Sequence, residues 1–208
     1  MTSTDAPERR YSLAIVQQPK RAKATTDQGR EVRPVEPYPI LRLRVQYLDP
    51  GFMVQVTLYD ETGREERAII PPDPSAPGAP PCNNMQLGTN VVHGSYVRDL
   101  DDRFGCFFCF ANIRVRLPGR YCLRFSLMQV PRGQEHSEPT RILQHVDSNT
   151  FRVYASTRDY PGTVPTSELA KKLAKQIPGI SIRNKGLLAA DYDSDGDAAA
   201  DDGGPAPT

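Results

Sequence analysis

The chain has 208 residues, of which 38% are hydrophobic, and this is enough for the core of one ordinary domain with tails. Its 20 prolines and 15 glycines fall below the share typical of a wholly low-complexity chain, so we expect a folded domain with irregular connections. No stretch approaches the roughly 20 apolar residues that cross a bilayer, and residues 1–10 lack the apolar core of a secretory signal, so we expect a soluble intracellular protein with no membrane partner.

The formal net charge of +1 conceals two pieces of opposite sign. Residues 189–208 contain six aspartates and neither lysine nor arginine, so the first 188 residues together carry a formal charge of +7. The composition after residue 187, rich in alanine, aspartate and glycine, predicts a disordered acidic tail over residues 188–208. We therefore expect a basic folded part followed by an acidic tail.

The first half of the chain predicts strands. Residues 1–10 are polar and are expected to be disordered, and the apolar run at 13–16, closed by Pro19, predicts an edge strand. A basic stretch from residue 20 to residue 33 is expected to be a loop. Apolar residues then alternate with polar ones over 41–47 and again over 54–58, and the turn residues between them predict a hairpin.

The second half of the chain also predicts mainly strands. Six prolines over residues 71–84 predict a loop, and strands are expected over 107–115 and 121–130, with further candidates at 142–143 and 151–153. One helix is predicted from an N-cap at Thr166 to a stop at Pro178, with Leu169, Leu173 and Ile177 on one face. Many short strands with one late helix predict a mainly β protein, a β-sandwich.

The residues that carry chemistry in enzymes are scattered. Cys106 and Cys109 form a Cys-x-x-Cys, but positions three apart on a strand face opposite sides, and Cys82, Cys122 and the three histidines supply no matching second pair of ligands. We expect buried thiols, with neither a metal nor another cofactor. The chain has no nucleophile elbow, phosphate-binding loop or His-Glu-x-x-His motif, so we expect a protein that is not an enzyme and has no small-molecule substrate.

Four blocks of sequence, in order, resemble the velvet domain of fungal developmental regulators. The first two are Leu13 to Lys23, which contains Gln17-Gln18-Pro19, and Arg33 to Pro39. The third, Phe107 to Leu127, is the most specific, and the fourth runs from Phe151 to Arg183. Together the blocks cover about residues 11–187, which we take as the domain. Asn112 and Arg114 stand where the family has aspartate and serine, and Val32 replaces a basic residue.

The resemblance implies a β-sandwich similar to the Rel-homology (immunoglobulin-like) fold, with one or two short helices near the C-terminus. It also implies sequence-specific binding of double-stranded DNA, action in the nucleus with shuttling to the cytoplasm, and pairing with itself or with another velvet protein. The function implied is transcriptional regulation of development, sporulation and secondary metabolism. The alternative is a protein-interaction scaffold of the same fold that does not contact DNA.

Five basic residues after the first strand are the candidates for DNA binding, because basic side chains neutralise phosphates and arginine also reads guanine edges. They are Lys20, Arg21, Lys23, Arg30 and Arg33. From composition alone they form a solvated charged loop, and it is the resemblance that favours a DNA contact. A second basic set is better explained as the solvated face of the predicted helix and the residues after it; it comprises Lys171, Lys172, Lys175, Arg183 and Lys185.

Overall fold

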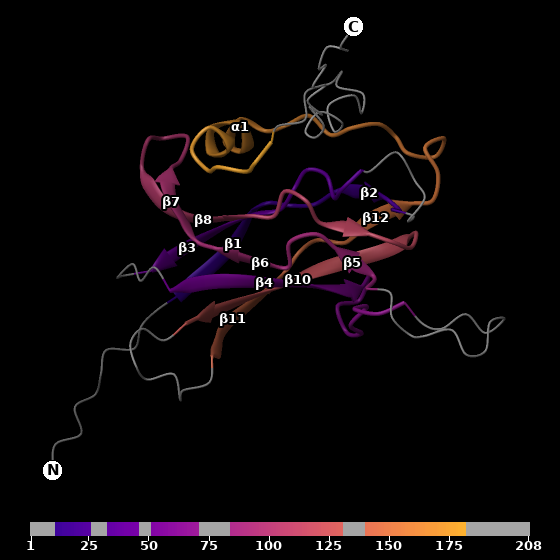
Figure 1. Ribbon diagram of the computed structural model, residues 1–208, viewed down its shortest axis with the longest axis horizontal. Coiled ribbons are helices and arrows are strands. Elements are labelled where there is room, and N and C mark those ends of the chain that lie inside the picture. Colours follow the sequence, from indigo (N-terminus) through magenta and orange to yellow (C-terminus); the bar gives the residue numbers. More distant parts are fainter. Residues whose placement is uncertain (1–10, 26–32, 46–50, 71–83, 131–139, 182–208) are drawn as a thin grey trace, which may run out of the picture.

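The computed structural model describes residues 11–25, 33–45, 51–70, 84–130 and 140–181. These residues form two β-sheets packed face to face, with one helix over the outer side of the first sheet (Figure 1). The predicted mainly β sandwich with a short helix near the C-terminus is confirmed. That helix, α1 (Glu168–Ala174), is the one helix of the described residues and is too short to cross a membrane.

The strands divide between two main sheets. The first sheet has the order β1 (Tyr11–Gln17), β3 (Ile40–Val45), β8 (Phe104–Cys109), β7 (Ser95–Arg98). The second has the order β2 (Arg21–Lys23), β12 (Phe151–Tyr154), β10 (Gly119–Gln129), β4 (Phe52–Asp60), β6 (Val91–His93), and β11 (Arg141–Asp147) also pairs with β10. A small ladder joins β5 (Gln86–Leu87) to β9 (Arg114–Val115). All of these pairs are antiparallel except β2 with β12, which is parallel.

Period-two alternation builds the core between the sheets. Val54, Val56 and Leu58 of β4 are buried, and the residues paired with them on β10 are also buried apolar side chains. On β8, Phe108 faces this core, whereas Phe107 faces a second core beneath α1. Both rings are almost fully covered, so the strand expected here is buried on both faces.

The predicted hairpin over residues 41–58 is wrong. β3 pairs with β1 and β8 in the first sheet, and β4 pairs with β10 and β6 in the second. The chain therefore changes sheets between the two strands. Turn residues reverse the direction of a chain equally well within a sheet and between two sheets, so the local pattern does not tell these cases apart.

Two shorter predictions also need correction. The basic stretch expected to be a loop contains β2, because Arg21 to Lys23 pair with Arg152 to Tyr154. The helix is capped by Ser167 rather than Thr166: the Ser167 hydroxyl accepts a hydrogen bond from the backbone N–H of Ala170 at 3.1 Å.

Of the proline-rich loop predicted over 71–84, residues 71–83 lie outside the described residues, as do residues 1–10 and the acidic tail.

Both edge strands of the first sheet are covered by a glutamine side chain. The amide of Gln144, on β11, accepts from the N–H of Leu13 at 2.8 Å and donates to its carbonyl at 3.3 Å. The amide of Gln176, after α1, does the same for Arg98 on β7, with both distances 2.9 Å. Each primary amide thus pairs with an edge residue as a neighbouring strand would, which protects the edge from pairing with another chain.

We expect Gln144→Ala to destabilise the protein by about 1–3 kcal/mol, because the half-buried N–H and C=O of Leu13 lose their partners. Gln176→Ala removes the matching pair from a more exposed site and should cost about 1 kcal/mol or less, since water replaces the amide. Urea unfolding of both variants measures the difference. Equal losses would show that the Gln144 amide contributes nothing beyond an exposed hydrogen bond.

The described cysteines are free thiols buried in different places. Cys106 faces the core between the sheets and Cys109 faces the core beneath α1, as expected of positions three apart on a strand. Burial raises the pKa of Cys106 to about 11 and that of Cys109 to about 12. Cys122, on β10, is also buried, and its pKa is raised chiefly by burial. Among the described residues, no group of three or more histidine, cysteine or acidic side chains has the arrangement of a metal site.

In a Cys82→Ser background, we expect the remaining three thiols to react with a thiol reagent at pH 8 far more slowly in the native protein than in urea. The raised pKa values leave little thiolate, and burial blocks access. The absorbance of a chromogenic thiol reagent, followed over time, gives the reaction rates of the native and of the unfolded protein. A native rate close to the unfolded rate would contradict the packing described for β8 and β10.

Candidate nucleic-acid interface

The position of β2 is set by the residues on either side of it. Gln17 donates to the carbonyl of Tyr38 at 2.7 Å and accepts from the Ser167 hydroxyl, which ties the end of β1 to the cap of α1. Gln18 accepts from the N–H of Asn149 at 2.9 Å, just before β12. The two glutamines of the first sequence block therefore have a structural role: their side-chain hydrogen bonds fix the chain just before β2.

A strap formed by residues 33–37 runs along the other side of β2. The carbonyl of Glu36 accepts from the N–H groups of Lys20 and Arg21 at 2.9 and 3.0 Å, and the N–H of Glu36 donates to the carbonyl of Arg21 at 2.7 Å. β2 is thus hydrogen-bonded to the strap on one side and to β12 on the other. A strand of only three residues is held in a fixed register.

The outward face of these two strands is basic and aromatic. Arg21 and Lys23 flank buried Ala22, and Arg152 and Tyr154 alternate with buried residues of β12. Because the parallel register pairs Arg21 with Arg152 and Lys23 with Tyr154, these four side chains lie on the same face of the sheet. The Arg152 guanidinium lies over the Tyr154 ring, 4.9 Å from its centroid.

Tyr160 holds a further cation, Arg33 of the strap, beside this face. The buried Tyr160 ring meets the Tyr154 ring edge to face at 5.7 Å, and the Arg33 guanidinium lies 5.2 Å from its centroid. The Tyr160 hydroxyl donates to the Glu36 carboxylate at 2.8 Å, and the N–H of Val164 donates to the same oxygen at 3.1 Å. Burial, followed by the bond to Glu36, raises the pKa of Tyr160, so the phenol stays protonated as the donor.

The contacts of Arg21 and Lys23 orient the cations. Arg21 donates to the carbonyl of Gly162 at 3.2 Å, and Lys23 donates to the Thr157 hydroxyl at 2.7 Å. Both acceptors are neutral oxygens, and the two bonds orient the side chains. We call Arg21, Lys23, Arg33, Arg152 and the two tyrosines, Tyr154 and Tyr160, the basic face.

Four of the five predicted DNA-binding residues are described. Arg21, Lys23 and Arg33 are brought together on the basic face, and Lys20 is exposed at the start of β2. Arg30 lies outside the described residues. Sequence reasoning missed Arg152: alternation with Phe151 and Val153 marks it as outward-facing, but no local pattern shows that β12 pairs with β2.

The second basic set lies elsewhere. Lys171 forms an ion pair with Glu168 at 2.7 Å, and Lys172 forms one with Asp102 at 2.6 Å. Lys175 is the exposed C-cap of α1, and Arg183 and Lys185 lie outside the described residues. Because Ala170 and Leu173 provide the packed side of the helix, these lysines belong to its solvated face, as predicted.

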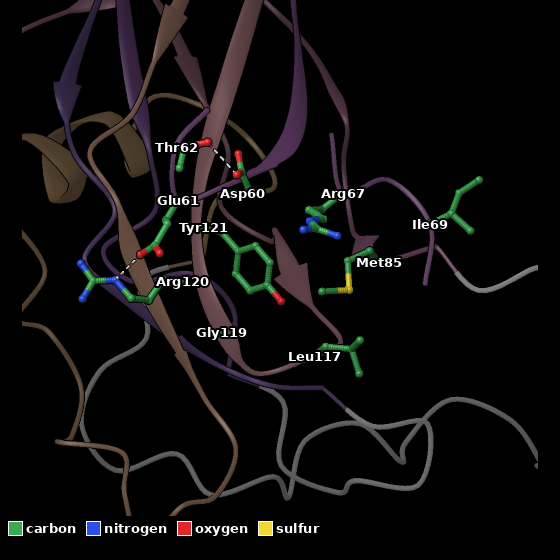
Figure 2. A pocket seen from close by; sticks show the side chains of 10 residues that line it. All are labelled: Asp60, Glu61, Thr62, Arg67, Ile69, Met85, Leu117, Gly119, Arg120 and Tyr121. Carbon is green, nitrogen blue, oxygen red and sulfur yellow. Dashed lines mark hydrogen bonds and ion pairs between the residues drawn. The ribbon is translucent and has the colours of Figure 1, made fainter. Parts of the chain in front are cut away.

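A shallow pocket of about 370 Å³ lies beside the start of β10 (Figure 2). Apolar side chains and the Tyr121 ring line part of it, and an ion pair between Arg120 and Glu61 lies at its border. Hydrogen bonds from the Thr62 hydroxyl and the N–H of Glu65 lower the pKa of Asp60 to about 2. Asp60 therefore stays ionised at neutral pH, which argues against a role as a general acid.

The departures from the velvet pattern at 112 and 114 lie beside the strap rather than among the side chains of the basic face, because the carbonyl of Ile113, between them, accepts from the N–H of Val35 at 2.8 Å. The Asn112 side chain accepts from the N–H of Thr89 at 2.9 Å, a role that an aspartate also fills. Arg114 is in the short ladder of β9 with β5, opposite Leu87. Asn112 therefore lies in the turn before β9, Arg114 lies in β9 itself, and Val32 lies outside the described residues.

Comparison with known proteins identifies the family of this chain. The model of the velvet factor family matches residues 11–77 and 70–186. The chain is 30% identical to the spore development regulator vosA of Beauveria bassiana, over 88% of this chain and 70% of that protein. It is 33% identical to the sexual development regulator umv3 of Mycosarcoma maydis and 28% identical to the developmental and secondary metabolism regulator VEL1 of Cochliobolus heterostrophus. Each of these two matches covers 88% of this chain, but only 47% and 33% of the respective relative. The chain belongs to the velvet family.

Proposed function

We propose that this protein is a sequence-specific DNA-binding transcriptional regulator of fungal development, sporulation and secondary metabolism. It acts in the nucleus as a homodimer or as a heterodimer with another velvet protein. The observation that carries the DNA-binding part is the basic face, where cations from β2, the strap and β12 meet on one surface. The names of the relatives, regulators of spore and sexual development, support the developmental role.

The side chains of the basic face are of the types that bind the phosphates of duplex DNA. Arginine and lysine side chains bind phosphates and release counterions, and a guanidinium held against an aromatic ring is already oriented before DNA arrives. Arg33 and Arg152 are both held in this way. The hydrogen bonds of Glu36 fix the strap relative to β2, so little ordering remains for the DNA to impose.

We expect the Arg21→Ala, Lys23→Ala double variant to bind duplex DNA at least about tenfold more weakly at low salt, because two phosphate contacts are lost. Fluorescence anisotropy across a salt series should show the slope of log affinity against log salt reduced by about 2. The matched control is Lys171→Ala with Lys175→Ala, which removes the same charge from the solvated face of α1. If the double variant stays folded and binds as tightly as the control, the assignment of the basic face is wrong.

A protein-interaction scaffold without DNA contact is the second candidate, and one observation favours it. Tyr96 and Phe104 are about half exposed and stack at 5.1 Å on the β7–β8 pair, with the Arg98 guanidinium 4.3 Å from the Phe104 centroid. Exposed aromatic residues beside arginine are typical of protein contact sites. Retention of the full chain on DNA resin at low salt and release at higher salt favours the DNA-binding function, and failure to bind the resin favours the scaffold.

A further inference from the structure

Three arginines lie side by side across the second sheet. Arg120 of β10 pairs in register with Arg152 of β12, which pairs in register with Arg21 of β2. Their neighbours Tyr121, Val153 and Ala22 are buried, so by alternation all three arginines lie on the outer face of the sheet. We call these three residues the arginine row.

Such a row is electrostatically unfavourable for the protein alone, because like charges directly opposite on adjacent strands destabilise a sheet. The same face of β10 shows the contrasting arrangement at Arg124. That guanidinium forms two hydrogen bonds of 2.7 Å with the Asp147 carboxylate, and Asp147 is the residue directly opposite on β11. The sheet thus places a carboxylate opposite Arg124, but another arginine opposite Arg120.

Only one end of the row is joined to an acid by a described ion pair. The Arg120 guanidinium lies 2.9 Å from the Glu61 carboxylate, beyond the end of β4 (Figure 2). Both side chains are more than half exposed, at 66% and 54%. An ion pair this exposed is worth little and is readily exchanged for another anion.

We propose that the arginine row is a track for the DNA phosphate backbone that extends from the basic face to β10, and that Glu61 restrains Arg120 until DNA displaces it. This proposal rests on the proposed function and adds a surface that reads no bases. Strands lie about 4.8 Å apart, so the row spans about 10 Å. One strand of B-DNA places on the order of three phosphates along that length of helix axis.

Arg120 and Glu61 should therefore have opposite effects on binding. Arg120→Ala should weaken DNA binding about three- to tenfold at low salt and reduce the slope of log affinity against log salt by about 1. Both effects should be the same for a duplex selected by the protein and for a scrambled duplex of the same composition. Arg120→Lys should keep most of the affinity, because a phosphate contact needs mainly the charge. Glu61→Gln should strengthen binding, and adding it to Arg120→Ala should have little further effect.

Matched controls separate these effects from general changes in charge. Glu65→Gln removes an acid that pairs with Arg67 at 2.9 Å in the same connection, and Arg103→Ala removes an exposed arginine next to β8 in the first sheet. Fluorescence anisotropy gives the affinities, and thermal unfolding checks that each variant is folded.

Three results overturn the proposal. If Arg120→Ala binds like Arg103→Ala while the Arg21, Lys23 double variant is weakened, the track is wrong and the proposed function stands. If Arg120→Ala weakens only the selected duplex, Arg120 reads bases and the row is not a phosphate track. If Glu61→Gln equals Glu65→Gln, Glu61 does not restrain Arg120.

Discussion

The arrangement of the basic face depends on one residue, Glu36. Its backbone N–H and C=O make three hydrogen bonds to the chain around β2, and its carboxylate accepts from both Tyr160 and Val164. Three segments distant in sequence are therefore joined at a single position. β2 has only three residues and little apolar surface of its own, so these bonds, its pairing with β12 and the hydrogen bonds of the residues on either side of it together fix its register. The Glu36 carboxylate accepts its described hydrogen bonds from neutral donors, a phenol and a backbone N–H.

Local alternation in the sequence predicted which side chains face the core. The alternation over residues 54–58 correctly placed Val54, Val56 and Leu58 in the core, and the helical spacing placed Leu173 on the packed side of the helix. It did not predict which strands are neighbours. The supposed hairpin of β3 and β4 failed for this reason, because pairing depends on contacts between residues far apart in the chain.

The same limit applies to the candidate site. A basic run before Pro34 is visible in the sequence, and it is the resemblance to the velvet domain that predicts DNA binding for it. Arg152 is the one arginine of β12 and Arg120 is one of two in β10, and only the registers of β12 with β2 and with β10 bring them beside Arg21. Parallel pairing of two strands more than a hundred residues apart leaves no periodic signal, so these residues could not be found by reading the chain.

The two glutamines that cover the edges of the first sheet have a consequence for how the molecule responds to its surroundings. Gln144 and Gln176 hold the edges with neutral amides, whose hydrogen bonds are insensitive to ionic strength and to pH over the range in which carboxylates and histidines titrate. The exposed ion pairs of the arginines in the second sheet, by contrast, are weakened by salt. A change in ionic strength therefore loosens charged contacts of the second sheet but keeps Leu13 and Arg98 paired at the edges of the first, so these two positions stay closed to pairing with another chain.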